Sequence, residues 1–269
     1  MAIITKITTQ QKNQDRFNVF MDYGKGEEYA FSVDSDVLIK FNLRKGMELD
    51  EFSFLEIQFA DDIRKAYNLA VHYLARRMRS EKEIRDYLLQ KETDEPIINE
   101  VLHKLTAQKY INDEEYAFSY VRTQINTTDK GPEVVQLELK DRGITEDIQK
   151  RALTEYPLEI QIEKAAKLCH KNAKKNMKES QRTARQKLEQ LLLRKGYPFE
   201  VIQAALNEAD TDKEVDDELE AIRFQGEKIQ RKYSKYSGYE YNQKVKQALY
   251  RKGFTMELIE KFLSEQEES

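Results

Sequence analysis

Two blocks of this sequence concentrate basic side chains in a way that suits phosphate groups or an acidic protein surface. Residues 161–195 contain eleven lysines and arginines against three glutamates, and residues 227–252 contain eight against two. In the first block the lysines recur at steps of three and four, so an expected helix carries them on one face. Like charges on one face repel each other, and contact with phosphates relieves that cost through counterion release. The candidate binding residues of this block are Lys164, Lys167, Lys171, Lys174, Lys175, Lys178 and Arg182.

The other side of the same expected helix is apolar, and an ordinary solvated face opposite a core also explains the lysines. The scarcity of acidic residues four positions away favours binding. The apolar stripe consists of Ile162, Ala165, Ala166, Cys169, Ala173 and Met177. Because Cys169 falls on this stripe, we expect it to be a buried structural thiol.

The second block, KIQRKYSKYSGYEYN at 228–242, alternates cations with tyrosines. Tyrosines beside cations in a loop can stack on nucleic-acid bases or on a partner's side chains. They are equally consistent with ordinary core and loop tyrosines. The candidates here are Lys228, Arg231, Lys232, Tyr233, Lys235 and Tyr236.

A third cluster of cations lies in ARRMRSEK at 75–82, where one expected helix ends and another begins. Arg76, Arg77 and Arg79 are candidates for partner or DNA contact. Compensation of the helix dipole explains the same three residues without any partner.

The residue types needed for catalysis or metal binding are sparse in this sequence. The single Cys169 excludes an intrachain disulfide, and His72, His103 and His170 are scattered. The glycines of GKGEEYA at 24–30 lack the spacing of a phosphate-binding loop. We therefore expect a protein that is not an enzyme and that uses no cofactor and no metal.

The composition is typical of a helix-rich, highly solvated chain. Of the 269 residues 35% are charged and 39% are hydrophobic, with 9 glycines and 4 prolines. Neither a long apolar segment nor a signal peptide is evident, so we expect a cytoplasmic protein with no membrane contact. The net charge of −4 conceals charge segregation, because residues 210–220 carry seven acids and one lysine between the two basic blocks.

The first 60 residues have a different pattern from the rest. RFNVFMD at 16–22 and EYAFSVD at 28–34 alternate apolar and polar residues, and Gly24 and Gly26 between them suit a hairpin turn. FSFLEIQ at 52–58 also resembles a strand. We predict a small N-terminal β element that packs against the segment that follows.

From residue 61 onward apolar residues recur at helical spacing, and start signals are frequent. Ser80 with Glu83, and Asn112 with Glu115, have the spacing of capping boxes. LLLRKGYPFEVIQAAL at 191–206 and ALYRKGFTMELIEKFL at 248–263 share a basic residue, a glycine and an aromatic residue. In each stretch basic residues in the last turn of a helix precede a glycine that can cap it, and start signals for another helix follow at once. This pattern predicts a helix, a tight turn and a second helix.

Apolar residues lie at the same distances in sequence from Gly143, Gly196 and Gly253. A degenerate copy of the pattern has Glu92 in place of the glycine. With a further helix upstream of each turn, one repeat contains three helices. We therefore predict a mainly α protein in which tandem three-helix repeats form an elongated, curved array behind a small N-terminal β element. The expected segments are the β element at 1–60 and repeats at 61–110, 111–157, 158–209 and 213–266.

These repeats, together with RRMRSEKEIRDYL at 76–88 and AQKYINDEEYAFSYV at 107–121, resemble the RecX family of bacterial regulators of the RecA recombinase. The N-terminal segment is similar to the extension of longer family members. The resemblance implies a non-enzymatic modulator that binds the RecA–DNA filament in its groove, contacts several protomers and hinders ATP hydrolysis and strand exchange. Shorter members have three repeats, whereas this chain has four.

The leading hypothesis from the sequence is therefore a RecX-like regulator that binds the RecA filament. We expect a monomer whose partners are RecA, single-stranded DNA and, more weakly, duplex DNA. An alternative is a helix-turn-helix protein that binds duplex DNA without RecA. A helical scaffold with no affinity for DNA is a third hypothesis.

Overall fold

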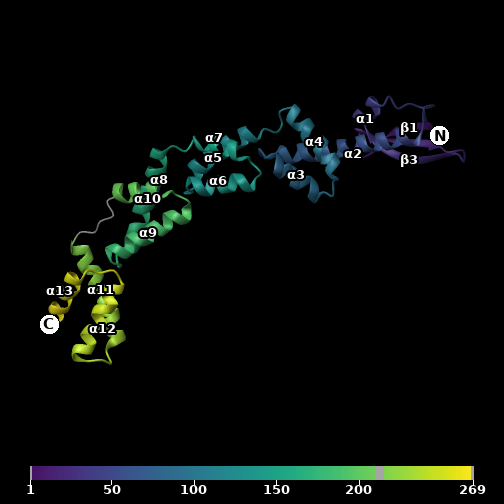
Figure 1. Ribbon diagram of the computed structural model, residues 1–269. Helices are drawn as coiled ribbons and strands as arrows, with labels where there is room; N and C mark the ends of the chain where they lie inside the picture. Colours follow the sequence, from purple (N-terminus) through teal and green to yellow (C-terminus); the bar gives the residue numbers. More distant parts are fainter. Residues whose placement is uncertain (1, 210–214, 268–269) are drawn as a thin grey trace. The chain divides into compact units, whose positions relative to one another are not determined.

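The structure, a computed structural model, describes residues 2–209 and 215–267, which form a small sheet followed by helices (Figure 1). The chain divides into two compact units. The first comprises the chain up to Tyr116 together with Arg142–Ile144, and the second comprises Ala117–Asp141 and the chain from Thr145 onward. The mainly α class, the tandem three-helix repeats and the N-terminal β element are confirmed. The residue limits given above for the five segments remain a prediction.

The β element is an antiparallel sheet with strand order β3-β2-β1-β4. The strands are β1 (Ala2–Thr9), β2 (Arg16–Asp22), β3 (Glu27–Asp34) and β4 (Glu48–Leu49). The expected hairpin between β2 and β3 is present, and Gly24 and Gly26 have φ angles of 92° and 109°. The Asp22 carboxylate accepts hydrogen bonds from the N–H groups of both glycines, and these bonds lower the pKa of Asp22. Strand β1 was not expected from the sequence.

The strand expected at 52–58 is wrong, because these residues belong to helix α2 (Glu51–Leu74). The Asp50 side chain accepts a hydrogen bond from the Ser53 N–H at 2.7 Å and so starts the helix. Within this helix Ile57 is buried against the sheet, whereas Phe52 and Leu55 are exposed. A short apolar run is compatible with the two-residue period of a strand and with the 3.6-residue period of a helix. Here the cap formed by Asp50 favours the helix.

Helix α2 belongs to two cores, because Ile57 packs in the core of the sheet while Ile63 and Ala66 pack in the core of the first repeat. Between these two cores lies buried Asp61. Its carboxylate binds Arg16 at 2.8 Å and accepts the Asp34 N–H at 2.8 Å. Burial alone would raise the pKa of Asp61. The hydrogen bonds from Arg16, the Asp34 N–H and Lys65 outweigh the effect of burial, so the pKa of Asp61 is lowered.

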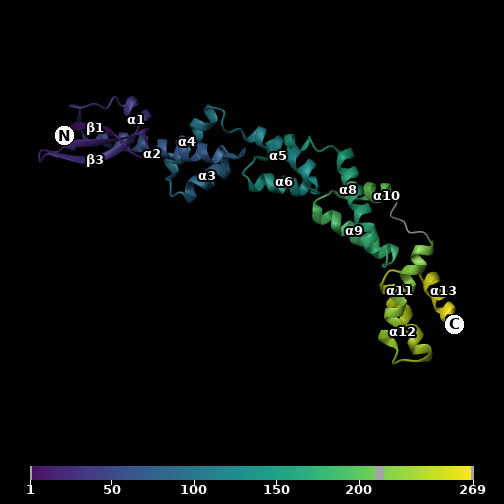
Figure 2. The same ribbon diagram turned by 180° about the vertical axis from the view of Figure 1, so that it is seen from behind.

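Each repeat consists of three helices, and Figure 2 shows the same succession from behind. In the first repeat α2 is followed by α3 (Glu81–Gln90) and α4 (Glu95–Ala107), while helix α1 (Ser35–Lys40) belongs to the β element. The remaining helices are α5 (Asp113–Thr127), α6 (Pro132–Asp141), α7 (Glu146–Leu153), α8 (Leu158–Ala173), α9 (Gln181–Lys195), α10 (Phe199–Glu208), α11 (Val215–Tyr233), α12 (Gly238–Arg251) and α13 (Met256–Glu267).

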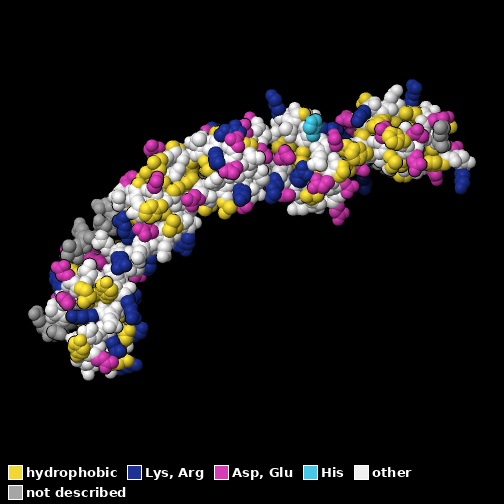
Figure 3. All heavy atoms as spheres, viewed as in Figure 1, with side chains coloured by type: hydrophobic (Ala, Val, Ile, Leu, Met, Phe, Trp, Pro, Cys, Tyr) yellow, Lys and Arg dark blue, Asp and Glu magenta, His cyan; other side chains and the backbone are white. Residues whose placement is uncertain are grey.

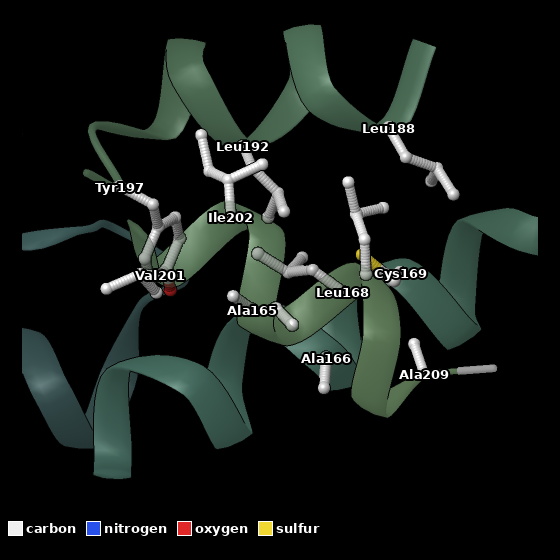
Figure 4. Packing of buried hydrophobic residues seen from close by; sticks show 12 residues of the cluster. Ala165, Ala166, Leu168, Cys169, Leu188, Leu192, Tyr197, Val201, Ile202 and Ala209 are labelled. Carbon is white, nitrogen blue, oxygen red and sulfur yellow. The ribbon is translucent and has the colours of Figure 1, made fainter. Parts of the chain in front are cut away.

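The core of the third repeat illustrates how each repeat is held together (Figure 4). Leu188 and Leu192 of α9 pack with Ile202 of α10. Cys169 of α8 is buried in the same cluster, as expected, and burial raises the pKa of its thiol to about 11. Met177, which was assigned to the apolar stripe, is 52% exposed because α8 ends at Ala173.

The turns that served to align the repeats share one backbone conformation. Gly143, Gly196 and Gly253 have φ angles of 80°, 79° and 88°, and Glu92 in the degenerate copy has a φ of 59°. The left-handed conformation therefore does not by itself require glycine in this chain. A further constraint must apply to the three glycine turns.

That constraint is a contact that occurs three times, which we call a joint. In each joint the start of one repeat's middle helix donates a hydrogen bond to the carbonyl that precedes the glycine of the next repeat. The bonds are Ser80 Oγ to Arg142 O at 2.8 Å (first joint), Gly131 N to Lys195 O at 2.6 Å (second joint) and Ser180 Oγ to Lys252 O at 2.5 Å (third joint). A Cβ atom on Gly143, Gly196 or Gly253 would meet these helix starts at 2.6–2.7 Å.

Candidate nucleic-acid and partner-binding surface

The arginine cluster at 75–82 is only partly available to a partner. Arg77 binds Glu83 at 2.6 Å, and Arg79 is largely buried 4.0 Å above the ring of Tyr73. These two arginines therefore help to hold the start of α3 in place. Arg76 is exposed and has no ion-pair partner among residues 2–209 and 215–267.

Lys164 also has a structural role. Its Nζ donates to the carbonyl of Ile125 and, at 2.7 Å, to that of Thr128, so it binds the last turn of α5. Burial lowers the pKa of Lys164. Lysine at this position neutralises the negative end of a helix dipole and satisfies carbonyls that have no partner within the helix. The expectation that Lys164 shares an exposed face with the other lysines is therefore wrong.

The remaining lysines of the first block do not continue along a single helix face. Helix α8 ends at Ala173, and Lys174 and Lys175 lie in the short 3-10 turn η1 (Lys174–Asn176). Lys167 is exposed but pairs with Glu163. Lys171, Lys174 and Lys175 are exposed and make no ion pair within the described part of the chain. They form a compact group at the end of α8, which we call the free lysine group.

Lys178 and Lys228 come together although 50 residues separate them in the sequence. Their Nζ atoms lie 4.4 Å and 4.1 Å from the ring centroid of Phe224. Two cations over one ring are stabilised by its quadrupole, yet both remain exposed. Arg231 on the same helix is exposed with a weak pair to Glu227 at 3.7 Å.

The tyrosine segment divides between core and surface. Tyr233 packs against the core of the fourth repeat, with Lys232 beside its ring. Tyr236 lies between Lys235 and Lys244, whose Nζ atoms are 5.2 Å and 4.4 Å from its ring centroid. In Figure 3, Lys and Arg side chains gather along one side of α11 and α12.

Tyr239, which was not among the candidates, is the tyrosine of this segment most open to solvent, at 81% exposure. It lies in the first turn of α12, directly after the loop that carries the other tyrosines. The signal was present in the sequence, because this tyrosine continues the alternation of cations and aromatic residues. The part of the acidic segment at 210–214 lies outside the described residues.

Within residues 2–209 and 215–267, no cluster of three or more His, Cys, Asp or Glu side chains is placed to hold a metal ion. The helices described there include none that is long and apolar enough to span a membrane. The fold is that of a helical repeat protein whose exposed cations are distributed over several repeats.

The chain belongs to the RecX family. The model of the regulatory protein RecX N-terminal domain matches residues 2–50, and models of the first and second RecX three-helix domains match residues 66–105 and 112–153. The model of the third three-helix domain matches twice, at 159–206 and 216–263. The fourth repeat is therefore a second copy of the third type.

Relatives of similar length carry the name regulatory protein RecX. That of Bacillus velezensis is 48% identical over 99% of this chain and 100% of its own, and that of Bacillus subtilis is 46% identical over the same shares. A crystal structure of regulatory protein RecX matches with a TM-score of 0.69 and 38% identity over 77% of this chain and all of that one. RecX from Lactobacillus salivarius gives a TM-score of 0.55 and 40% identity, covering 57% of this chain and 99% of that one.

Proposed function

We propose that this protein binds the RecA recombinase filament on DNA and reduces its ATPase and strand-exchange activities. Membership of a family of regulatory proteins supports this proposal most strongly. In the proposed mechanism the protein acts as a monomer in the cytoplasm, by binding rather than by catalysis. RecA filaments present the same surface at regular intervals, and tandem repeats suit a target of that kind.

In this proposal the exposed cations supply the contact with the DNA of the filament. The free lysine group has no internal ion pair among the described residues, so its charge remains available to phosphates. Phosphate contacts of this kind give affinity without sequence preference and weaken as salt rises. A regulator that follows a filament on any sequence needs affinity of that type.

Binding across neighbouring protomers would restrain the movements that accompany ATP hydrolysis and strand exchange. A protein that contacts several protomers gains avidity from each added contact, because the later contacts are intramolecular. We therefore expect inhibition to set in near a stoichiometric ratio of regulator to filament.

The competing function is direct binding to duplex DNA in the manner of a helix-turn-helix protein. The tight turn at Gly196 between α9 and α10, next to exposed cations, is the feature that favours it. This function predicts tight, salt-sensitive binding to bare duplex and a preference among sequences.

Binding measured against bare single-stranded DNA, bare duplex and RecA-coated DNA across a salt series separates these functions. Preference for the coated DNA supports the proposal, preference for bare duplex supports the alternative, and indifference to all three indicates a scaffold. The charge-reversal variant Lys171→Glu/Lys174→Glu/Lys175→Glu should lose most of the affinity for coated DNA. The matched control, Lys12→Glu/Lys25→Glu/Lys45→Glu, reverses three exposed lysines of the β element and should retain it.

A further inference from the structure

We infer that the third joint contains a binding site for a phosphate group of the nucleic-acid backbone. This inference rests on the proposed contact with DNA and assigns it to a defined place. The site is a cleft of about 250 Å³ between the start of α9 and the end of α12. Its lining residues are Arg182, Thr183, Gln186, Tyr250, Arg251 and Gly253.

The walls of the cleft are held by the joint itself. The hydroxyl groups of Ser180 and Thr183 both donate to Lys252 O, at 2.5 Å and 2.8 Å. Close by, the N–H of Gln181 binds the Glu218 carboxylate at 2.9 Å and so fixes α9 to α11. Arg182 and Arg251 therefore project from two elements whose relative position is set by hydrogen bonds.

The lining of the cleft carries two cations. Arg182 and Arg251 are both exposed, and neither has an ion-pair or hydrogen-bond partner among residues 2–209 and 215–267. The described lining residues include no acid. Two guanidinium groups in one small cleft repel each other, so an anion that binds between them gains from both.

Comparison of the three joints shows that this charge is not a requirement of the joint. We compare three positions in each joint. Two of them lie two and six residues after the hydrogen-bond donor at the helix start, which is Ser80, Gly131 or Ser180, and the third lies two residues before the turn glycine. They are occupied by Arg182, Gln186 and Arg251 at the third joint, by Lys82, Asp86 and Asp141 at the first, and by Glu133, Leu137 and Arg194 at the second.

Each of the other two joints thus carries at least one acid for its single cation. At the first joint Lys82 pairs with Asp86 at 3.5 Å across one helical turn. The hydrogen bond to the carbonyl before the turn glycine is thus made twice without excess positive charge and once beside two cations, so the excess charge at the third joint points to a ligand and is not needed to make the joint.

The geometry favours a nucleic-acid phosphate over an acidic peptide. The cleft has room for a phosphate group, and guanidinium groups bind phosphate oxygens in pairs. The Gln186 amide can donate to a third oxygen. Tyr250, at 57% exposure, borders the cleft and offers a ring on which an adjacent base can stack.

The most direct test copies the first joint. Gln186→Asp places an acid four residues from Arg182, as Asp86 is from Lys82, and leaves both arginines in place. We expect the affinity for a fluorescent single-stranded oligonucleotide to fall about tenfold and the slope of log affinity against log salt to fall by about one. Arg182→Gln/Arg251→Gln should show a larger loss of both.

Asn126→Asp adds the same charge to an exposed position of α5 outside the cleft and serves as the control. Circular dichroism checks that all variants remain helical. Unchanged affinity and salt slope in both Gln186→Asp and the double arginine variant would overturn the assignment of the site. If inhibition of RecA nevertheless persisted, the proposed function would stand without this cleft. A loss for an acidic peptide but not for the oligonucleotide would instead assign the cleft to a protein partner.

Discussion

The glycine turns allow the strongest quantitative prediction, because two matched substitutions separate backbone strain from joint packing. Gly196→Ala places a methyl group in the left-handed conformation, where the Cβ atom would lie 2.6 Å from the Val134 backbone nitrogen. Glu92→Ala tests a residue with nearly the same φ angle that takes part in none of the three joints.

The expected magnitudes follow from these two differences. Left-handed strain costs about 1–2 kcal/mol for a residue other than glycine, and overpacking at a tight contact costs about 1–3 kcal/mol more. Gly196→Ala should therefore lower the stability of the second joint by about 2–5 kcal/mol. Glu92→Ala exchanges one side chain with a Cβ atom for another, so its effect should stay within about 0.5 kcal/mol.

Hydrogen exchange followed by mass spectrometry is the suitable assay, because a chain with two units need not unfold in one step. We expect Gly196→Ala to speed exchange in α6 and at the end of α9, and to leave the β element unchanged. Equal effects of the two alanine substitutions would refute the claim that glycine is required at the joints by packing as well as by conformation.

Three further predictions concern buried groups. Asp61→Asn removes the partner of Arg16 and should destabilise the first unit by about 3 kcal/mol in urea unfolding monitored on that unit. The pKa of Asp61 is lowered in the folded state, so its contribution to the free energy of unfolding is complete above the unfolded pKa of about 3.9. This contribution disappears as the pH falls through the folded pKa, so the wild type should lose its greater stability over the variant in acid. Lys164→Met should destabilise the end of α5 by about 2 kcal/mol in hydrogen exchange and change DNA affinity less than twofold, since this lysine is bound to carbonyls. Cys169 should react with a maleimide only on unfolding, because it is buried and its thiol pKa is about 11, and fast labelling of the native protein would contradict its placement.

Much of the fold was predictable because helix periodicity and capping residues are local properties of the chain. Ser80 and Glu83 form the expected capping box, with hydrogen bonds in both directions. The alignment of the repeats on their turns also found Glu92, which adopts the left-handed conformation of the glycines. Local signals failed at 52–58, where a short apolar run fitted both a strand and a helix.

The candidate surface was less predictable because it depends on contacts between distant residues. Lys164 has the spacing of a surface lysine, yet its carbonyl partners lie 36 and 39 residues earlier in the chain. From the sequence, Arg251 lies in the basic last turn of a helix, where compensation of the helix dipole accounts for its charge. Only the fold shows that it shares a cleft with Arg182, and only the comparison of the three joints shows that its charge is in excess.

In the proposed function this protein restrains the RecA filament through its exposed cations. The most direct test is the DNA-dependent ATPase activity of RecA with the regulator added at a stoichiometric ratio. We expect the wild-type protein to lower the activity and Lys171→Glu/Lys174→Glu/Lys175→Glu to lower it much less. If the rate of ATP hydrolysis stays unchanged when the wild-type protein is added, the proposed function is wrong.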